Sequence, residues 1–497
     1  MKSNVSIPFA VGAMCAAASL AFASDEITVE KYPDADTVIV NDKIETVYQA
    51  DGTYVTTDEE WTKALTERGR RSLSTISIDY SLRYGKGEIV LVEIIGADGK
   101  ARPVDFRSTL KEATDNSSTG ANIYDPLDKT LSCAVPGLKV GETRHIITRR
   151  EATKSRVKDS WASMELLEST VPIARASVRI DGPISRPLRS VAVRHPLGNV
   201  TQSVVTNGDR VVWSWVASNS PQMFTEPSMP PYWTQAQHVR VSTVGDWREL
   251  SRWYWELSLP HLERTNAAMT NKVAEIKAQK DGGDLVRRIY RFVSQEIRYM
   301  GLTMEDTSPG YAPHDVCLTF DNRYGVCRDK AALLVAMLRI AGFEAYPVLI
   351  SASKAKMDKE VPTPFFNHAI AAVKLDGKYV LMDPTDESSR DLLPAYLSDC
   401  SYLVAHPEGE TLLTSPVVAP EKNSVAVTGK GRLEKDGSLL IEYAMSFRGI
   451  NDNAYRRALL TRKPEERRKF FEKLASSVAA GAELLRCEIF PKDLQDT

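Results

Sequence analysis

The sequence predicts an α+β protein, in which a β-sandwich-like domain precedes an α+β core and a smaller C-terminal region that contains a β-hairpin. Two patterns predict this class. Short alternating strands with turn signals dominate the first half, and helices with apolar stripes begin near residue 247. At 497 residues the chain is too long for one hydrophobic core. We expect a leader, a β-rich domain, a core and a C-terminal region at residues 1–23, 24–245, 246–420 and 421–497.

The first 23 residues have the three parts of a secretory signal peptide. Lys2 supplies a short positive region, residues 5–20 are mostly apolar, and Ala21-Phe22-Ala23 is an A-x-A cleavage site. The apolar run is too short to span a membrane, and no later run reaches the length of a span. The sequence therefore predicts a periplasmic or secreted protein, cut after Ala23, without an integral membrane segment in the mature chain.

Residues 25–245 carry the pattern of a β-sandwich. Ile76, Ile78 and Tyr80 alternate with polar residues, and Val211, Trp213 and Trp215 follow the turn signal Asn207-Gly208. We also expect one helix before these strands, in TTDEEWTKALTERGRR, and an exposed polar loop over residues 113–128. Short strands at regular spacing are typical of a sandwich.

Helices are predicted next, at about 247–257, 263–280 and 284–299. A long connection over residues 301–326 and a second loop over 353–366 follow them. Long loops in compact domains are often functional, so we expect these two to form the walls of a cleft. Tyr311, His314 and Tyr324 are candidate cleft residues, although ordinary loop packing explains each of them equally well.

A cysteine stands where the next predicted helix begins. Cys327 precedes the apolar stripe of Ala331, Leu334 and Leu338, and Gly342 supplies the usual C-terminal cap. The partial positive charge at a helix N-terminus stabilises a thiolate, which is the nucleophilic form of cysteine. The alternative interpretation of Cys327 is a small buried residue at the start of a core helix.

A predicted hairpin supplies a histidine and a carboxylate. A two-residue turn at Asp376-Gly377 would pair Leu375 with Lys378, and the same register makes His368 and Asp383 diagonal neighbours on one face. Cysteine with histidine and aspartate is the layout of a thiol nucleophile with an oriented base. His314 is the rival base, but no register argument supports it.

Residues 284–390 resemble the transglutaminase-like superfamily of papain-type thiol enzymes. RYGVCRDKAALLVAMLRIAGFEAYPVLI resembles its nucleophile block, and NHAIAAVKLDGKYVLMDPT resembles its histidine and aspartate blocks. The resemblance implies that Cys327 is the nucleophile, His368 the general base and acid, and Asp383 the orienting carboxylate. The order of blocks and WRELSRWYWEL at the junction resemble a bacterial exported subgroup with an N-terminal β-rich domain of unknown function.

The chemistry predicted from these residues is acyl transfer through a thioester. A protein or peptide amide is the expected substrate, with water as acceptor in a peptidase or amidase and an amine as acceptor in a transglutaminase. This chemistry needs no cofactor and no metal. A non-catalytic exported binding or scaffold protein is the alternative, although a scaffold has no need for all three residues.

Charge and cysteine content exclude other classes. The formal net charge of −2 offers no argument for nucleic acid as a partner. Five cysteines remain after cleavage at Ala23, without a CxxC motif, which argues against a disulfide framework and a structural zinc site.

The sequence of residues 421–497 predicts a hairpin that turns at Asp436-Gly437, followed by helices near 451–460 and 464–480. The apolar stretch Leu484–Phe490 reads as a strand without a later partner, as in a sequence that stops inside a domain.

Overall fold

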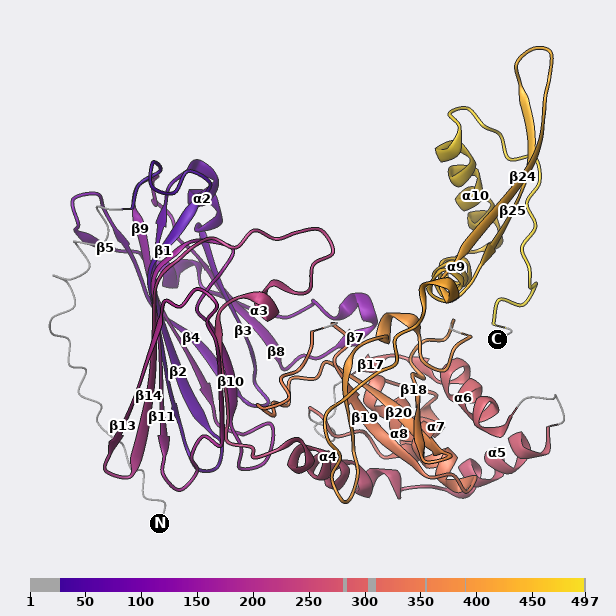
Figure 1. Cartoon of the computed structure of the whole chain (residues 1–497), viewed down its shortest axis with the longest axis horizontal. Helices are drawn as coiled ribbons and strands as arrows, with labels where there is room; N and C mark the ends of the chain where they lie inside the picture. The colour runs from indigo at the N-terminus through magenta and orange to yellow at the C-terminus, as the bar shows by residue number, and fades with distance from the viewer. Residues whose placement is uncertain (1–26, 280–283, 303–309, 354, 389, 496–497) are drawn as a thin grey trace.

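The computed structural model describes residues 27–279, 284–302, 310–353, 355–388 and 390–495. Three parts follow one another along the chain in Figure 1, namely a large β-rich part, a core of helices and strands, and a C-terminal arm. The predicted α+β class is confirmed. The predicted signal peptide lies outside the described residues.

One large twisted sheet and two small sheets form the β-rich part. The large sheet has, in spatial order, β13 (Val200–Asn207), β14 (Arg210–Ser220), β11 (Ile173–Pro183), β1 (Thr37–Tyr48), β2 (Tyr54–Ala64), β9 (Thr143–Ala152), β4 (Gly85–Ile95) and β5 (Ala101–Pro103). The small sheets are β10 (Ala162–Leu166), β15 (His238–Ser242) and β12 (Ser190–Arg194), and β3 (Thr75–Ser81), β8 (Asp128–Ala134) and β6 (Lys111–Thr114).

Two hydrophobic clusters hold the small sheets against the large one. Ile76 and Ile78 of β3 share one cluster with Val92 of β4. Trp215 of β14 shares the other with Val241 of β15. The predicted alternation therefore does place apolar side chains between layers, as in a sandwich.

The helix predicted in TTDEEWTKALTERGRR is wrong for most of its length. Residues 54–64 form β2, between β1 and β9, and only Glu67–Ser72 are helical. Central pairing decides this segment, because both edges of β2 are hydrogen-bonded to neighbours and Trp61 stacks on His145 of β9 at 4.3 Å. Tertiary contacts of this kind override local helix propensity.

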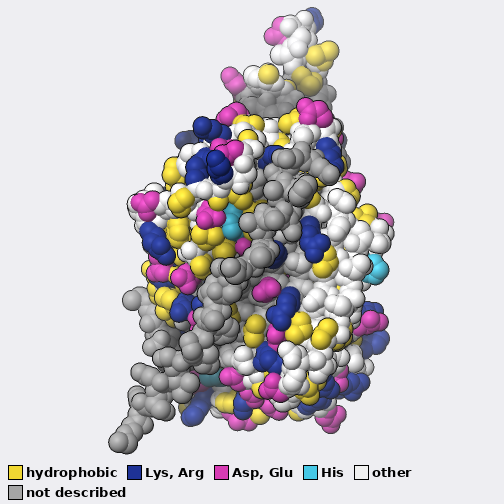
Figure 2. Space-filling model, turned by 90° about the vertical axis from the view of Figure 1, so that its left-hand side faces the viewer, with side chains coloured by type: hydrophobic (Ala, Val, Ile, Leu, Met, Phe, Trp, Pro, Cys, Tyr) yellow, Lys and Arg dark blue, Asp and Glu magenta, His cyan; other side chains and the backbone are white. Residues whose placement is uncertain are grey.

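The face of the β-rich part seen in Figure 2 carries Lys and Arg side chains interspersed with Asp and Glu. Such mixing agrees with the nearly balanced charge of the sequence. Among the described residues that this view leaves uncovered, the two signs of charge are mixed rather than gathered into separate patches.

The core packs helices against an antiparallel sheet (Figure 1). Its strands are, in order, β21 (Lys378–Met382), β20 (His368–Leu375), β19 (Ala345–Ile350), β22 (Ser401–Val404) and β23 (Leu413–Thr414). Its helices are α4 (Trp247–Leu262), α5 (Ala267–Ala278), α6 (Leu285–Glu296), α7 (Val316–Asn322) and α8 (Cys327–Ile340). The three helices predicted before residue 300 are confirmed, as is the helix that begins at Cys327.

Two predicted loops contain regular structure instead. The connection at 301–326 includes α7, and part of it, residues 303–309, lies outside the described residues. The expected polar loop at 113–128 includes β7 (Ile123–Tyr124), which pairs with β17 (Gly301–Leu302). This parallel pair joins the β-rich part to the core by backbone hydrogen bonds. No local sequence pattern predicts such a long-range contact.

The C-terminal arm contains the predicted hairpin, β24 (Val425–Leu433) and β25 (Leu439–Phe447), and the two predicted helices, α9 (Ile450–Leu460) and α10 (Pro464–Val478). The strand predicted at Leu484–Phe490 is wrong. β24 and β25 pair only with each other among the described residues, and the Leu484 carbonyl accepts a hydrogen bond from the Arg468 side chain. A strand requires a partner strand, and among the described residues this stretch pairs with none.

Candidate active site

The cysteine lies at the start of a helix that is locked in place. Cys327 is the first residue of α8, and the next turns of α8 are buried. The Asp329 carboxylate accepts hydrogen bonds from the backbone N–H groups of Val326, at 3.0 Å, and of His314, at 2.9 Å. These bonds hold the first turn, so that the helix N-terminus and its partial positive charge are fixed beside the thiol.

The histidine and the carboxylate come from the ribbon of β20 and β21. Asp376 and Gly377 adopt positive φ values of 49° and 75°, as a type I′ turn requires. Leu375 pairs with Lys378, and the pairing continues to Ala371 with Met382, so the predicted register is confirmed. One more step along this register sets Ile370 opposite Asp383, and His368, two residues from Ile370 on the same face, has Nε2 at 3.0 Å from Asp383 Oδ2.

Asp383 is fully buried and fully hydrogen-bonded. Thr385 donates its backbone N–H and its hydroxyl to Oδ1, at 2.9 and 2.7 Å, and Tyr396 donates its hydroxyl to Oδ2 at 2.8 Å. Burial by itself would raise the pKa of this carboxyl, but the charge and hydrogen bond of His368, together with Thr385, lower it. Asp383 is therefore held as a carboxylate in the protein interior.

Burial and neighbouring charges also act in opposite directions on the pKa values of His368 and Cys327. Burial opposes a charge on His368, yet Asp383 and Cys327 raise its pKa to about 10. Burial would also raise the pKa of the Cys327 thiol, but the hydrogen bond and charge of His368, with help from Arg328 and the Ala369 N–H, lower it. The favoured form of the pair is a thiolate beside an imidazolium.

A tyrosine that the sequence did not single out completes the surroundings of the thiol. Tyr299 lies on β16 (Arg298–Tyr299), which pairs in parallel with β18 (Tyr324–Gly325) just before α8. Its hydroxyl hydrogen-bonds with both the side chain and the backbone N–H of Cys327. Burial, the charge of Cys327 and the bond with its side chain raise the pKa of Tyr299, whereas the bond with the backbone N–H opposes this rise. Only the pairing of two short strands 26 residues apart brings Tyr299 to the thiol, so no local signal could have found it.

A buried lysine of α8 holds the segment that carries Tyr299. The Lys330 side chain is 0 % exposed, and Nζ donates to the carbonyl oxygens of Ser294, at 3.1 Å, and Ile297 at the end of α6. Burial lowers the pKa of Lys330 to about 8, against the opposing charge of Glu387. Lys330 thus ties α8 to the residues just before Tyr299.

The candidate cleft residues have separate roles. His314, the rival base, has Nδ1 at 3.2 Å from Asp329 Oδ1 and supports the first turn of α8. Tyr311 donates its hydroxyl to the Pro364 carbonyl, so that the two predicted wall loops touch. Tyr324 lies on β18. The five described cysteines, Cys317 and Cys327 among them, are free thiols.

Two protein-family models match the chain. Residues 269–384, which include Cys327, His368 and Asp383, match the transglutaminase-like superfamily. Residues 50–224 match a domain of unknown function, DUF3857. No curated protein matches the chain.

Among solved structures, a protein from Parabacteroides distasonis described as a "putative protease" has a TM-score of 0.61 at 15 % identity, over 79 % of this chain and 77 % of that one. That similarity shows a shared fold. A "putative cysteine protease" from Cytophaga hutchinsonii has a TM-score of 0.19 at 11 % identity, over 76 % of this chain and 88 % of that one. An M1 zinc metallopeptidase from Deinococcus radiodurans has a TM-score of 0.23 at 12 % identity, over 42 % of each chain. TM-scores this low do not indicate a shared fold.

The family matches cover the two parts that the fold separates, and the first structural relative spans both. The resemblance found in the Cys, His and Asp blocks is therefore confirmed. Residues 269–384 of the chain belong to the transglutaminase-like superfamily, and they follow a region, residues 50–224, that matches DUF3857.

Proposed function

We propose that this protein is a cysteine-dependent enzyme that transfers the acyl group of a protein or peptide amide through a thioester on Cys327. One observation carries the proposal. His368 hydrogen-bonds with Cys327 on one side and with the buried Asp383 on the other. A scaffold protein gains nothing from a buried ion pair, whose desolvation costs several kcal/mol per ion, whereas a thiol nucleophile requires one.

In the first half of the reaction the Cys327 thiolate attacks the carbonyl carbon of the amide. A C–S bond forms, the carbonyl oxygen takes the electron pair, and the C–N bond then breaks. The His368 imidazolium gives its proton to the departing amine. Asp383 keeps the imidazole ring oriented and stabilises its charge, as the third member of such triads does.

In the second half an acceptor attacks the thioester. His368 takes the acceptor's proton, the C–S bond breaks, and the Cys327 thiolate is released with the imidazolium restored. Water as acceptor gives hydrolysis, and an amine gives transamidation. The fold shared with the Parabacteroides distasonis protein described as a "putative protease" favours a peptide substrate and water as the acceptor.

Two donors near the thiol are suited to the negative oxygen of the intermediate. The backbone N–H of Cys327 lies at the helix N-terminus, and the Tyr299 hydroxyl contacts that N–H and the sulfur. A substrate oxygen that entered between these two groups would be hydrogen-bonded from both sides. We assign Tyr299 as the second oxyanion donor on this ground.

The thiolate–imidazolium pair gives a pH dependence. Because the Cys327 pKa is lowered and the His368 pKa is raised to about 10, the pair exists between those two values. Alkylation of Cys327 by iodoacetamide should therefore stay fast at pH 7, ahead of Cys133, Cys317, Cys400 and Cys487, and slow only as pH falls through the lowered thiol pKa. Turnover should also decline above about pH 10, where His368 loses its proton. Mass spectrometry after limiting alkylation measures the first effect.

The variant His368→Ala tests whether His368 lowers the pKa of Cys327. Without His368, burial is opposed only by Arg328 and the Ala369 N–H, so the Cys327 pKa should rise. Alkylation at pH 7 should then slow by roughly tenfold or more. His314→Ala should retain fast alkylation. A slow, unselective Cys327 in the natural chain would favour the scaffold alternative, and loss in His314→Ala but not in His368→Ala would make His314 the base.

The variant Asp383→Asn tests Asp383 as the third member of the proposed triad. We expect kcat to fall by about 10²–10⁴-fold, because the imidazolium loses its carboxylate and the ring can settle in the wrong tautomer. The variant keeps the size of the side chain, so the melting temperature should change little. Hydrolysis of, or amine incorporation into, a glutamine-containing peptide pool measures activity. His368→Ala should cost at least as much, and the double variant should lose little beyond His368→Ala alone, since these residues act as a unit.

Lys374→Ala is the control for this experiment. Lys374 lies on the same ribbon near its turn and pairs with Glu344 at 3.2 Å, away from the thiol. Its removal should leave turnover almost unchanged. Normal turnover in Asp383→Asn would rule the triad out.

Tyr299→Phe removes only a hydroxyl. We expect kcat to fall by about 10²-fold, the usual effect of losing one oxyanion donor, while alkylation of Cys327 stays fast because His368 is intact. Tyr324→Phe, on the paired strand, is the control, since its hydroxyl has no hydrogen-bond partner among the described residues. An unchanged kcat in Tyr299→Phe would remove Tyr299 from the mechanism.

We also propose that the protein is exported, to the periplasm or outside the cell, on the basis of the A-x-A site at Ala21-Phe22-Ala23. No helix in the described part of the chain is long and apolar enough to cross a membrane. N-terminal sequencing of protein recovered from the exported fraction should begin at Ser24. A retained Met1, or a lipid on Cys15, would contradict the assignment.

A further inference from the structure

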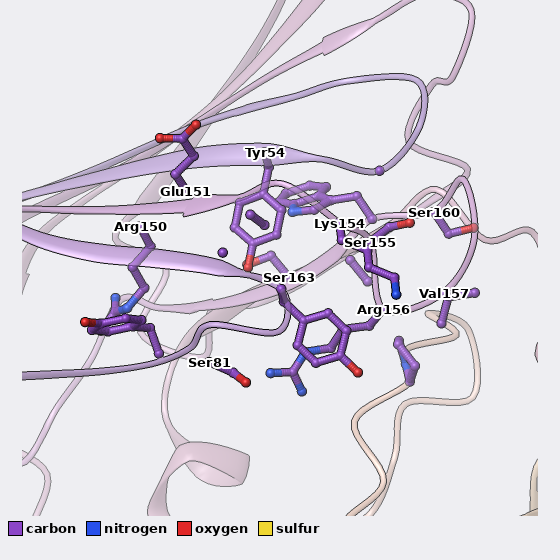
Figure 3. A pocket seen from close by; sticks show the side chains of 18 of the residues that line it. Tyr54, Ser81, Arg150, Glu151, Lys154, Ser155, Arg156, Val157, Ser160 and Ser163 are labelled. Carbon is purple, nitrogen blue, oxygen red and sulfur yellow. The ribbon is translucent and has the colours of Figure 1, made fainter. Parts of the chain in front are cut away.

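A pocket of about 490 Å³ lies where the β-rich part meets the core (Figure 3). Its walls come from β2, β3, β4, β9 and β10, from the loop after β9, and from Pro364 and Phe365 of the core. None of the three triad residues lines it. The volume lies in the range of pockets that bury a small ligand or a few side chains of a peptide.

Basic groups predominate in this pocket. Lys154 and Arg156, on the loop after β9, have no carboxylate within ion-pair distance among the residues that the structure describes. Lys86 is paired with Glu151 at 3.4 Å. Asp79 is the remaining carboxylate of the lining, and it accepts the Thr130 hydroxyl at 2.6 Å. Arg150 also lines the pocket, and its charge opposes the raised pKa of the Asp58 and Glu165 carboxyls. Lys154 and Arg156 are thus the cations left available for a ligand.

The loop that carries these cations is held at both ends. The Tyr84 carbonyl accepts the N–H groups of Thr153, at 2.8 Å, and Lys154, at 3.2 Å. Val157 is only 6 % exposed and belongs to the hydrophobic cluster of the core. Between these anchors the Arg156 guanidinium lies 5.0 Å from the centre of the Tyr84 ring. Arg156 is therefore placed before any ligand arrives, which lowers the entropy cost of binding.

Tyr84 links this pocket to the surroundings of the thiol. A Cβ atom on Gly310 would lie 1.9 Å from the Tyr84 hydroxyl, so the two residues are in close contact. Burial raises the pKa of Tyr84, and the charges of Arg156 and Arg328 both oppose that rise. Arg328 is the residue after Cys327. On the other wall, Phe365 stands three residues before His368. The pocket therefore adjoins the approach to the reacting groups.

We propose that this pocket binds a carboxylate of the peptide substrate, either an acidic side chain or a terminal carboxylate, through Lys154 and Arg156. The proposal deepens the proposed function, because it names the class of peptide that the enzyme would select. The rings of Tyr54, Trp161 and Phe365 line the same pocket and offer surface for the neighbouring parts of the peptide. Selectivity for acidic peptides would then be set by the β-rich part.

Direct binding tests the proposal apart from catalysis. The probes are a fluorescein-labelled decapeptide with four aspartates and its counterpart with four asparagines, added to the full chain carrying Cys327→Ala. Fluorescence anisotropy should give a Kd about tenfold lower for the aspartate peptide, because charge-assisted hydrogen bonds are stronger than neutral ones. That preference should shrink between low and high NaCl, as exposed charges are screened.

Arg156→Ala should weaken binding of the aspartate peptide by roughly 3–10-fold and leave the asparagine peptide unaffected. Arg156→Lys should keep most of the preference, and Arg156→Glu should abolish it. Lys158→Ala is the matched control, since Lys158 is an exposed cation of the same loop that does not line the pocket. Melting curves of each variant verify that it is folded.

Equal Kd values for the two peptides, or an equal loss in Lys158→Ala, would overturn the proposal. The two proposals fail in different ways. Charge-selective binding without turnover in the natural chain would contradict the enzyme and uphold the pocket. Turnover of neutral and acidic peptides at the same kcat/KM would uphold the enzyme and contradict the pocket.

Discussion

The hydrogen bond between His368 and Asp383 is the interaction on which the site depends. It joins an imidazole to a carboxylate that is fully buried, and a buried charge is tolerated only when it is paired and hydrogen-bonded. Thr385 and Tyr396 supply the remaining donors, so Asp383 stays ionised without water. The charge of Asp383 then raises the pKa of His368, and His368 in turn lowers that of Cys327. The charge state of Cys327 therefore depends on His368, and that of His368 depends on Asp383.

Helix α8 is the second constraint, because it fixes the thiol from the other side. Asp329 closes the first turn and also holds the His314 backbone. Lys330 reaches the last carbonyls of α6, just before Tyr299. One turn of helix therefore positions the proposed nucleophile and holds the segment of the proposed oxyanion donor. Small movements of α8 would disturb both at once, which is why burial of its whole middle matters for the chemistry.

The β-rich part does more than precede the core. Strand β7 pairs with β17 immediately after Tyr299, and Tyr84 packs against Gly310 on the loop that leads to α7. The loop after β9 places Val157 in the hydrophobic cluster of the core. The two family regions are thus interlocked through backbone pairing and buried side chains. The region that matches DUF3857 thus lies beside the proposed site, and we propose that it takes part in selecting the substrate.

The sequence by itself determined the parts of the site whose geometry is local. The Asp376-Gly377 turn and the two-residue period of strands were enough to predict the register of β20 and β21, and helix signals were enough to begin α8 at Cys327. Tertiary structure decided everything that depends on partners distant in the chain. β2 became a strand because two neighbours hydrogen-bond to it, residues 484–490 pair with no strand of the described chain, and Tyr299 reached the thiol through a pair of two-residue strands. Local patterns encode turns, caps and periodicity, whereas strand pairing across long loops is selected by the energy of the assembled core.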